Sequence, residues 1–354
     1  MTPLANILAR RIEASGPISL ADYMAECLMH PKHGYYQRER VFGQDGDFIT
    51  APEVSQMFGE TIGLWLADRW IVMGRPNPVN LVELGPGRGT LMADILRAAG
   101  KVPGFKDAAE VHFIETSAQL RALQAEKVPD ATWHDDFSSV PEGPSLVVAN
   151  EFFDALPIHQ YVKQGGKWFE RSVGMVGDSL GFVLTQPAAQ FALVPPHLLR
   201  APDGSLLEVC PGAISTSATI AAHLAAHGGA ALYIDYGYGI SAPGDTFQAL
   251  KKHEFTDPFT EPGKADLTAH VAFDRIAEAA ESAGAKASPT TEQGTFLMTI
   301  GLGVRAQKLA ERASDKSQER ILGELKRLTA PDEMGTLFKV LAVQNPALPA
   351  APGF

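Results

Sequence analysis

The sequence predicts a doubly wound α/β fold, in which helices cover both faces of a mostly parallel sheet. Apolar runs of strand length alternate with longer runs of helical periodicity, which is typical of parallel sheets. A glycine-rich loop joins the first of these strands to a helix, and polar side chains follow directly after several strands. We expect strands at 79–84, 110–115, 145–149 and 230–235, and helices at 90–99, 117–125 and 212–226.

A helical region is expected before the first of these strands. Residues 4–13 have helical spacing, and Ser19 fits the N-cap of a second helix. Residues 30–52 are loop-rich, and a longer helix over about 54–73 carries large apolar side chains mostly on one face. These side chains are Phe58, Ile62, Trp65, Leu66 and Trp70. We therefore assign residues 1–75 to an N-terminal helical or cap region.

The core that follows, residues 76–345, is expected to carry insertions. The first, at about 158–208, has short alternating strands and glycine turns, which favours antiparallel strands added to the core. The second, at 236–265, is rich in Gly, Pro and aromatic residues. A helix near 270–283 and a strand near 285–290 then resume the core.

A third insertion, at about 300–330, precedes the last strand. Residues 304–328 have the spacing of one or two charged amphipathic helices. The run 336–343, Thr-Leu-Phe-Lys-Val-Leu-Ala-Val, is then typical of a buried strand. Residues 346–354 form a short tail that is rich in Pro and Ala.

Composition limits the classes of partner. The chain has 354 residues, 45% of them apolar and 20% charged, which is ordinary for a globular protein large enough to bury a sizeable core. Its formal net charge of −11 argues against a long nucleic-acid footprint, so no nucleic-acid partner is expected. The two cysteines, Cys27 and Cys210, give neither a disulfide framework nor metal-ligand spacing, so we expect no metal site.

No membrane insertion is expected either. Residues 209–234 carry no Lys, Arg, Asp or Glu, but His223, His227 and the pair Gly228-Gly229 interrupt the run, which favours a helix followed by a buried strand. The N-terminal residues contain acidic side chains and no apolar signal core, unlike a signal or transit peptide. The simplest expectation is a cytoplasmic protein.

The loop after the first core strand predicts the ligand. Glu83 ends the strand, and Gly85, Gly87 and Gly89 alternate before the helix. A dinucleotide loop would have the spacing G-x-G-x-x-G, whereas here the third glycine is one position early and an acid precedes the first. Glycines allow close approach of the backbone to a ligand, and Glu83 can hold an ammonium group. This pattern favours S-adenosylmethionine; the alternative is a tight turn without a ligand.

Three further residues fall at expected carboxyl ends of strands, where open α/β sheets bind ligands. Glu115 can accept hydrogen bonds from both ribose hydroxyls, a signal that is shared with NAD-binding folds. Asp135, in His-Asp-Asp-Phe (134–137), can accept the adenine amino group, although a solvated acidic turn explains it equally well. Asn150 lies at the end of the third expected strand.

Residues 150–157, Asn-Glu-Phe-Phe-Asp-Ala-Leu-Pro, place two acids and two aromatics directly after an apolar strand. A methyl acceptor would lie here, beside the sulfonium. Methyl transfer is an in-line displacement, so the protein supplies mainly position and electrostatics. Glu151 and Asp154 are therefore candidate catalytic residues that would hold and orient an amine or guanidinium. Alternatively, Glu151 caps a helix and Asp154 bonds local backbone.

These segments, with several others, resemble the MidA-type S-adenosylmethionine-dependent methyltransferases. The glycine loop alone indicates only a superfamily, whereas the segments at 46–60 and 150–157 are more specific. The matching segments are Gly-Pro-Ile-Ser (16–19), Tyr-Met (23–24), His-Gly-Tyr-Tyr (33–36), Gly-Asp-Phe-Ile-Thr-Ala-Pro-Glu-Val-Ser-Gln-Met-Phe-Gly-Glu (46–60), Glu-Leu-Gly-Pro-Gly-Arg-Gly-Thr-Leu (83–91), Asn-Glu-Phe-Phe-Asp-Ala-Leu-Pro (150–157), Ile-Asp-Tyr-Gly-Tyr (234–238) and Gly-Lys-Ala-Asp-Leu-Thr-Ala-His-Val (263–271).

The resemblance implies a Rossmann-like, seven-stranded class I methyltransferase core. The family includes a mitochondrial complex I assembly factor that is a protein arginine methyltransferase. The resemblance therefore implies a protein substrate, namely an arginine in a subunit of respiratory complex I, and a role in assembly of that complex. It also implies a cofactor loop of Glu83, Gly85, Gly87 and Gly89, with Glu115 as the ribose acid.

Other polar segments have two explanations each. Asp47, Thr50, Ser55 and Gln56 either close over the cofactor or serve packing and N-capping. Residues 235–238, Asp-Tyr-Gly-Tyr, either line the acceptor pocket or end a strand whose aromatics pack on the insertion. Asp266 and His270 are pocket polar groups or, more simply, structural ones.

Several functions remain open on the sequence. The leading one is arginine N-methylation of a complex I subunit. A small-molecule or other amine methyltransferase would use the same core and the same acids. A non-catalytic assembly chaperone would use the fold to hold a partner, although an intact glycine loop argues against it. The glycine spacing disfavours an NAD-dependent enzyme, and the net charge disfavours an RNA methyltransferase.

Overall fold

The structure, a computed structural model, describes residues 2–37, 50–252, 254–311 and 313–354. The chain divides into two compact units, each assembled from three separate segments. Unit 1 contains Met1–Phe48, Asp154–Ser215 and Ser241–His270, and unit 2 contains Ile49–Phe153, Thr216–Ile240 and Val271–Phe354. The domain boundaries expected from the sequence stay a prediction.

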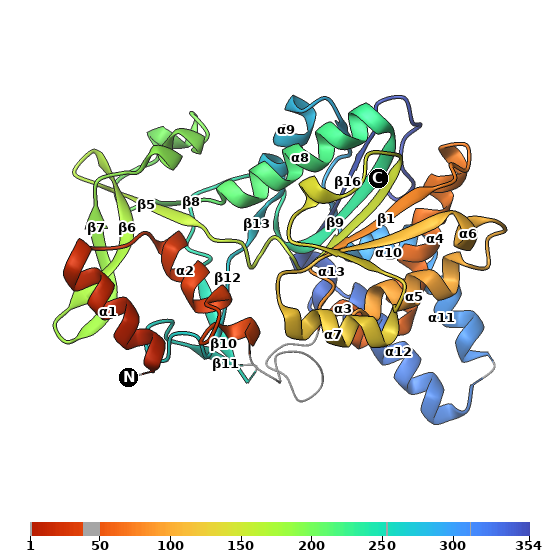
Figure 1. Cartoon of the computed structure of the whole chain (residues 1–354), viewed down its shortest axis with the longest axis horizontal. Helices are drawn as coiled ribbons and strands as arrows, with labels where there is room; N and C mark the ends of the chain where they lie inside the picture. The colour runs from red at the N-terminus through yellow and green to blue at the C-terminus, as the bar shows by residue number, and fades with distance from the viewer. Residues whose placement is uncertain (1, 38–49, 253, 312) are drawn as a thin grey trace. The chain divides into compact units, whose positions relative to one another are not determined.

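Unit 2 is built on one mixed sheet (Figure 1). Its path runs in the order β3-β2-β1-β4-β9-β16-β14; β13 also pairs with β9, and β15 with β16. The strands from β3 to β9 pair in parallel, which is the doubly wound α/β arrangement that the sequence predicts. The strands are β1 (Val79–Leu84), β2 (Ala109–Ile114), β3 (Thr132–His134), β4 (Ser145–Asn150), β9 (Gly229–Tyr238), β13 (Val271–Ala272), β14 (Lys286–Ala287), β15 (Thr291–Glu292) and β16 (Phe338–Gln344).

The last strands form an antiparallel edge of the sheet. β16 pairs antiparallel with β9 on one side and with β14 on the other. The strand expected near 285–290 is two short strands, β14 and β15, separated by Ser288, Pro289 and Thr290. Proline cannot donate a ladder hydrogen bond, which accounts for the break. Four helices fill the insertion before β16: α10 (Gln293–Thr299), α11 (Leu302–Ala310), α12 (Asp315–Thr329) and α13 (Met334–Leu337).

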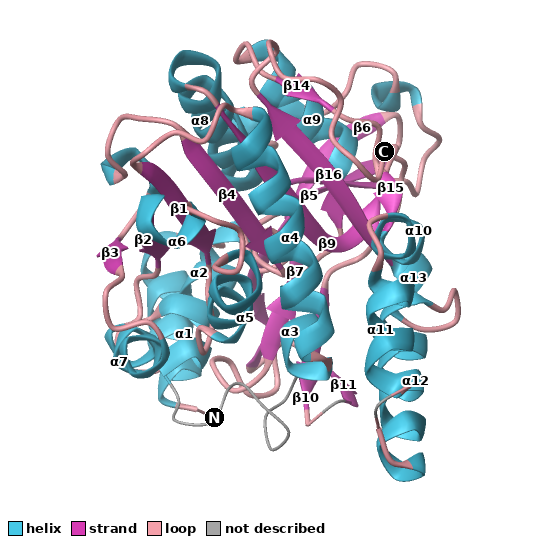
Figure 2. Ribbon diagram, turned by 90° about the vertical axis from the view of Figure 1, so that its right-hand side faces the viewer, coloured by secondary structure: helices cyan, strands magenta, loops and turns pink. Residues whose placement is uncertain are grey.

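The central parallel strands β1, β4 and β9 are buried on both faces, as near-continuous apolar runs predict. All six residues of β1 and all six of β4 are buried. Helix α4 packs on β4 and β9, and Figure 2 shows it crossing the sheet, while α9 packs on β9 and β16. Unit 2 also contains the helices α3 (Ala51–Val54), α4 (Gln56–Val72), α5 (Thr90–Ala99), α6 (Phe105–Ala108), α7 (Ala118–Lys127), η2 (Phe137–Ser139) and α9 (Phe273–Ser282). Helix α8 (Pro211–His227) begins in unit 1 and continues into unit 2.

Unit 1 combines the N-terminal helices with two small sheets. The Ser19 hydroxyl accepts a hydrogen bond from the Asp22 backbone N–H and caps α2, which confirms the expected N-cap. A four-stranded antiparallel sheet has the order β7-β6-β5-β8, and a three-stranded sheet has the order β11-β10-β12. The elements are α1 (Pro3–Ser15), α2 (Leu20–Met29), η1 (Tyr35–Gln37), β5 (His159–Gln164), β6 (Lys167–Val176), β7 (Ser179–Thr185), η3 (Ala189–Leu193), η4 (Leu198–Arg200), β8 (Leu206–Val209), β10 (Gln248–Lys251), β11 (Glu254–Thr256) and β12 (Asp266–Thr268).

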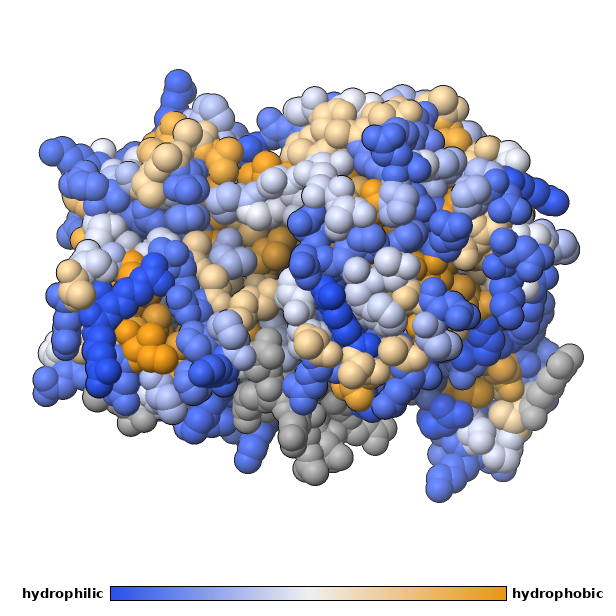
Figure 3. All heavy atoms as spheres, viewed as in Figure 1, coloured by the Kyte–Doolittle hydropathy of each residue, from blue (hydrophilic) through white to orange (hydrophobic). Residues whose placement is uncertain are grey.

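The surface is more hydrophilic than these buried cores. The face drawn in Figure 3 is mostly hydrophilic, with apolar atoms in small patches. Among the described residues, no helix combines the length and the apolar character that a membrane crossing requires.

Helices α4 and α5 approach each other through glycine. A Cβ added at Gly63 would lie 2.8 Å from the Ile95 carbonyl oxygen and 2.9 Å from the Ile95 Cα. Backbone atoms cannot turn away as a flexible side chain can, so this pair of helices requires a residue without a Cβ. The close approach holds α5, and with it the loop at the start of α5, against α4.

Gly63→Val should therefore lower the free energy of unfolding by about 1–3 kcal/mol, because overpacking forces the two helices apart. Urea denaturation would measure the change. Gly323→Val in α12 is the matched control, since a Cβ there meets nothing within 4 Å; its effect should stay within about 0.5 kcal/mol. Equal effects at the two positions would contradict the explanation.

Candidate functional site

The glycine loop lies between β1 and α5. Gly85, Gly87 and Gly89 have φ values of 60°, 51° and 74°, in the left-handed region where glycine is favoured. A Cβ at Gly85 would lie 2.9 Å from a ring carbon of Phe152, and one at Gly89 would lie 3.4 Å from the Gln124 Cα. The loop thus needs glycine both for its conformation and for its contact with the turn after β4.

Glu83 is a buried carboxylate immediately before this loop. Only 3% of the residue is exposed, and its Oε2 atom has no hydrogen-bond partner among the described residues. Burial raises the pKa of Glu83 to about 8, while a hydrogen bond from the Met92 backbone N–H and the charge of Lys127 act in the opposite direction. A buried polar atom without a partner is uncommon in native structures and can mark a ligand site.

Glu115 follows β2 and is held at both carboxylate oxygens. The Ser117 backbone N–H donates to Oε1 at 2.8 Å, and the Gln124 amide donates to Oε2 at 3.3 Å. Burial raises the pKa of Glu115, and these two hydrogen bonds oppose the rise. Its backbone N–H donates to the carbonyl of His134, so the ends of β2 and β3 are joined.

Asp135 lies after β3 with 80% of its side chain exposed. Its carboxylate accepts a hydrogen bond of 2.5 Å from the Arg121 guanidinium. The neighbouring Asp136 caps η2, because its Oδ1 accepts from the Ser138 backbone N–H at 2.8 Å. The contact with adenine proposed for Asp135 stays a prediction.

The chain turns sharply after β4. Glu151 has a φ of 51°, which is rare for a residue other than glycine and often marks a functional or strained site. Its Oε1 atom accepts hydrogen bonds from the Ala51 backbone N–H at 2.9 Å and from the Asn150 amide at 3.0 Å. The Glu151 carboxylate therefore fixes the first turn of α3, as the helix-capping alternative supposed; a catalytic role stays a prediction.

Asp235 holds this turn from the neighbouring strand. It is fully buried, and its Oδ2 accepts hydrogen bonds from the backbone N–H groups of Phe152 and Phe153 at 3.1 and 2.9 Å. Residues 235–238 form the end of β9, which extends beyond the expected strand at 230–235. A Cβ at Gly237 would lie 2.1 Å from the Val271 carbonyl, so glycine allows β13 to pair with β9.

The other expected site residues lie in unit 1 or outside the residues that the structure describes. Asp154 is 7% exposed, and its backbone carbonyl accepts from the Ala269 N–H at 3.0 Å. The His270 N–H donates to the Thr246 hydroxyl at 2.9 Å, and the Tyr36 hydroxyl lies 3.5 Å from an oxygen of Asp266. Asp47 lies outside the described residues.

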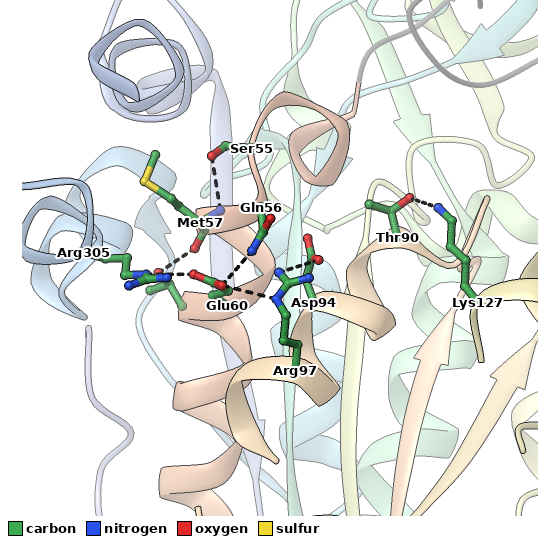
Figure 4. A network of polar contacts seen from close by, with 10 residues as sticks. Ser55, Gln56, Met57, Glu60, Thr90, Asp94, Arg97, Lys127 and Arg305 are labelled. Carbon is green, nitrogen blue, oxygen red and sulfur yellow. Dashed lines mark hydrogen bonds and ion pairs between the residues drawn. The ribbon is translucent and has the colours of Figure 1, made fainter. Parts of the chain in front are cut away.

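A polar network lies beside the glycine-loop helix (Figure 4). Glu60 on α4 is buried and accepts from Gln56 at 2.9 Å, Arg305 at 2.8 Å and Arg97 at 3.4 Å. Burial acts to raise the pKa of Glu60, but the hydrogen bonds from Arg305 and Gln56 and the charges of Arg305 and Arg97 together lower it. Arg97 also pairs with Asp94 on α5 at 2.7 Å. The network joins α4 to α5 and to the inserted helix α11.

A second chain of contacts ties α3 to the start of α5. The Thr90 hydroxyl donates to Glu53 on α3 at 2.8 Å, and the Lys127 ammonium donates to the Thr90 hydroxyl at 2.6 Å. Ser55 caps α4 and donates to Glu324 on α12 at 2.7 Å. The described contacts of Ser55 and Gln56 match the capping and packing alternative.

Three residues whose partners the sequence did not predict form hydrogen bonds between segments that are distant in the chain. Gln124 lies in no motif, whereas Glu60 and Asp235 belong to the segments 46–60 and 234–238 but had no predicted bonding partner. Each is buried and hydrogen-bonded to another element. The sequence offered one signal for Gln124 and Asp235: they lie on a predicted helix and a predicted strand of the core, near strand ends.

A family of S-adenosyl-L-methionine-dependent methyltransferases matches residues 61–291 of this sequence. That match covers most of the chain, including the glycine loop. The chain belongs to this family. It is a methyltransferase, and its cofactor is S-adenosylmethionine.

Curated relatives match this methyltransferase over nearly its whole length. It is 39% identical to the mitochondrial protein arginine methyltransferase NDUFAF7 homolog of Drosophila melanogaster, over 96% of this chain and 84% of the relative. It is 35% identical to the Homo sapiens protein of that name, also mitochondrial, over 97% of this chain and 83% of the relative. The expectation of a cytoplasmic protein is therefore wrong, since the relatives are named mitochondrial.

Solved structures confirm the class I methyltransferase fold. A methyl transferase of Burkholderia thailandensis bound to S-adenosyl-homocysteine superposes with a TM-score of 0.84 at 28% identity, covering 99% of this chain and 93% of that one. A second crystal structure from Burkholderia thailandensis gives a TM-score of 0.82 at 30% identity, with 98% and 93% covered. The likeness extends over both units.

The Glu83 carboxylate gives this methyltransferase a pH-dependent stability. The pKa of about 8 in the folded protein lies above the ordinary 4.5, so the folded state favours the protonated form. This contribution is complete below about pH 4.5 and is lost as the pH rises to about 8.

Glu83→Gln should remove the dependence. In urea denaturation of the ligand-free protein, the variant should become steadily more stable relative to the wild type between about pH 5 and 8. Glu126→Gln, at an exposed position on α7, is the control and should follow the wild type. Parallel pH profiles of Glu83→Gln and wild type would show that Glu83 is not buried in its neutral form.

Proposed function

We propose that this chain is a protein arginine N-methyltransferase that acts on a subunit of respiratory complex I and supports assembly of that complex. The curated relatives of Drosophila melanogaster and Homo sapiens, both named protein arginine methyltransferases, support the substrate class. The resemblance of the motifs at 46–60 and 150–157 to a complex I assembly factor supports the partner. An acidic chain, with a net charge of −11, also suits a basic acceptor.

The observation that carries the cofactor assignment is the Glu83 Oε2 atom, which has no hydrogen-bond partner among the described residues. A buried carboxylate oxygen needs a cation or a donor, and the ammonium group of S-adenosylmethionine is one. We assign the ammonium to Glu83 and the close backbone approach to Gly85, Gly87 and Gly89. The other assigned cofactor contacts are Glu115 to the ribose hydroxyls, Asp135 to the adenine amino group and Asn150 beside the methionine end.

The acceptor would bind at the turn after β4. S-adenosylmethionine, when bound, would supply an electrophilic methyl group, and the acceptor nitrogen would form its N–C bond as the S–C bond of the cofactor breaks. Glu151 and Asp154 would orient the guanidinium and accept the proton that leaves its nitrogen. Hydrogen bonds from Ala51 and Asn150 restrict the Glu151 carboxylate to one orientation, which suits a positioning role.

The proposal predicts one methylated protein. Purified enzyme and S-adenosylmethionine with a tritiated methyl group, added to a lysate of cells lacking this gene, should label one band. Acid hydrolysis should release the label as methylarginine, and mass spectrometry should identify the band as a complex I subunit. Gly87→Val should label nothing, because a side chain at a φ of 51° is strained and would overlap the ligand.

Each part of this experiment can fail separately. Label in small molecules alone would exclude a protein substrate, and a methylated residue other than arginine would exclude that acceptor. A labelled band from outside complex I would overturn the partner. If Gly87→Val still restores complex I assembly in cells, the fold serves as a chaperone and methylation is not its role.

Glu151→Gln should lower kcat by about 100-fold while changing the Kd for S-adenosylmethionine by no more than about threefold. Glutamine keeps a carbonyl oxygen that can accept from Ala51, so the fold of α3 should survive. Radiometric assays and isothermal titration would separate the two constants, with Glu126→Gln as the matched control. An unchanged kcat would remove Glu151 from the acceptor site.

A further inference from the structure

Gln124 on α7 is a buried side-chain amide that joins three parts of the assigned cofactor site. It is completely buried. Its Nε2 atom donates to the Gly87 carbonyl at 2.8 Å and to the Glu115 Oε2 at 3.3 Å. Its Oε1 atom accepts from the Trp133 indole N–H on β3 at 2.8 Å. One amide thus contacts the glycine loop, the acid after β2 and strand β3.

These contacts restrict the amide to one orientation. The indole N–H of Trp133 can only donate, so it requires the oxygen of the amide on its side. The Nε2 atom must then face Gly87 and Glu115, both of which present acceptors. Because a buried amide that loses a partner is costly, the three contacts stabilise one another.

The Glu115 carboxylate is consequently fixed at both oxygens. The Ser117 backbone N–H holds Oε1, and Gln124 holds Oε2. Each carboxylate oxygen can accept more than one hydrogen bond, so both keep acceptor capacity. The two neighbouring hydroxyls of a ribose can donate to both oxygens of Glu115 at once only if the plane of the carboxylate is held in one orientation.

We propose that Gln124 is a positioning residue that sets the selectivity of this enzyme for a nucleoside with both ribose hydroxyls. It acts through Glu115 by orienting the carboxylate, and through Gly87 by fixing the loop to the same amide. The proposal rests on the proposed function, in which Glu115 accepts hydrogen bonds from the ribose. We assign Gln124 no contact with the methyl group or the acceptor.

The test compares S-adenosylhomocysteine with its 2′-deoxy analogue by isothermal titration. The wild type should bind the analogue at least about tenfold more weakly, because a buried acceptor loses its hydroxyl donor. Gln124→Met keeps the shape but makes no hydrogen bond, so the two ligands should differ by less than about threefold. Its KM for S-adenosylmethionine should rise about tenfold, with kcat within about twofold of the wild type.

Two other variants keep the test decisive. Gln119→Met, exposed on the same helix, is the matched control and should retain the wild-type discrimination. Gln124→Glu keeps an acceptor for Trp133 but loses the donors and places a like charge beside Glu115. It should also lose discrimination, and it serves if Gln124→Met does not fold.

Glu115→Gln separates the inference from the function on which it rests. If Glu115→Gln retains discrimination, the ribose role of Glu115 is wrong and the inference fails with it. If Glu115→Gln loses discrimination while both Gln124 variants retain it, only the inference is overturned. The expected result is loss in all three, with no further loss when Gln124→Met and Glu115→Gln are combined.

Discussion

The parallel pairing of β1 with both β2 and β4 is the constraint on which the site depends. In this register Glu83 lies level with Phe113 on β2 and Val148 on β4, so its backbone is inside the sheet and its carboxylate is buried. Parallel strands bring their carboxyl ends to one edge. Glu115 follows β2 and Asn150 ends β4. The parallel pairing alone therefore brings both residues to the same edge as the glycine loop.

Two features at this edge cost folding free energy: a buried carboxyl group at Glu83 and a left-handed backbone conformation at Glu151. Burial keeps the Glu83 pKa far above its ordinary value, and Glu151 adopts a left-handed backbone conformation. Both are tolerated because the surroundings are fixed: Asp235 accepts two N–H groups of the turn after β4, and Ala51 bonds the Glu151 carboxylate. Costs of this kind tend to collect at functional sites, where a ligand relieves them.

The sequence predicted the parts of the fold that local patterns determine. The bounds of β1 and α5 match the expected ones, and the spacing of the glycines correctly indicated S-adenosylmethionine and not NAD. The sequence implied a strand end before Asp135 but gave no bounds for β3. Three residues, Thr-Trp-His, are too few to show periodicity, and pairing with β2 makes them a strand. The roles of individual site residues stay predictions, since they depend on where ligand atoms lie.

Long-range contacts explain why other features could not be read from the sequence. Gln124 bonds a carbonyl that is 37 residues away, and Glu60 pairs with Arg305 across 245 residues. In the sequence Gln124 is one more polar residue on a helix, where a solvated face is the ordinary interpretation, and the motif that ends at Glu60 does not indicate its partner. Only the packing of α7 against the loop, and of α11 against α4, converts them into buried groups with fixed partners.

The network around Glu60 also bears on why this methyltransferase carries helices before its last strand. Ser55, Gln56 and Glu60 begin α4, and their partners come from α4 itself, α5, α11 and α12. The inserted helices are therefore held by these hydrogen bonds as well as by their chain connections to β15 and β16. They are bonded to the same helix that packs against α5, whose first residue, Thr90, contacts Glu53. Side-chain hydrogen bonds thus join the inserted helices to α4 and α5, and a separate set joins the start of α5 to α3.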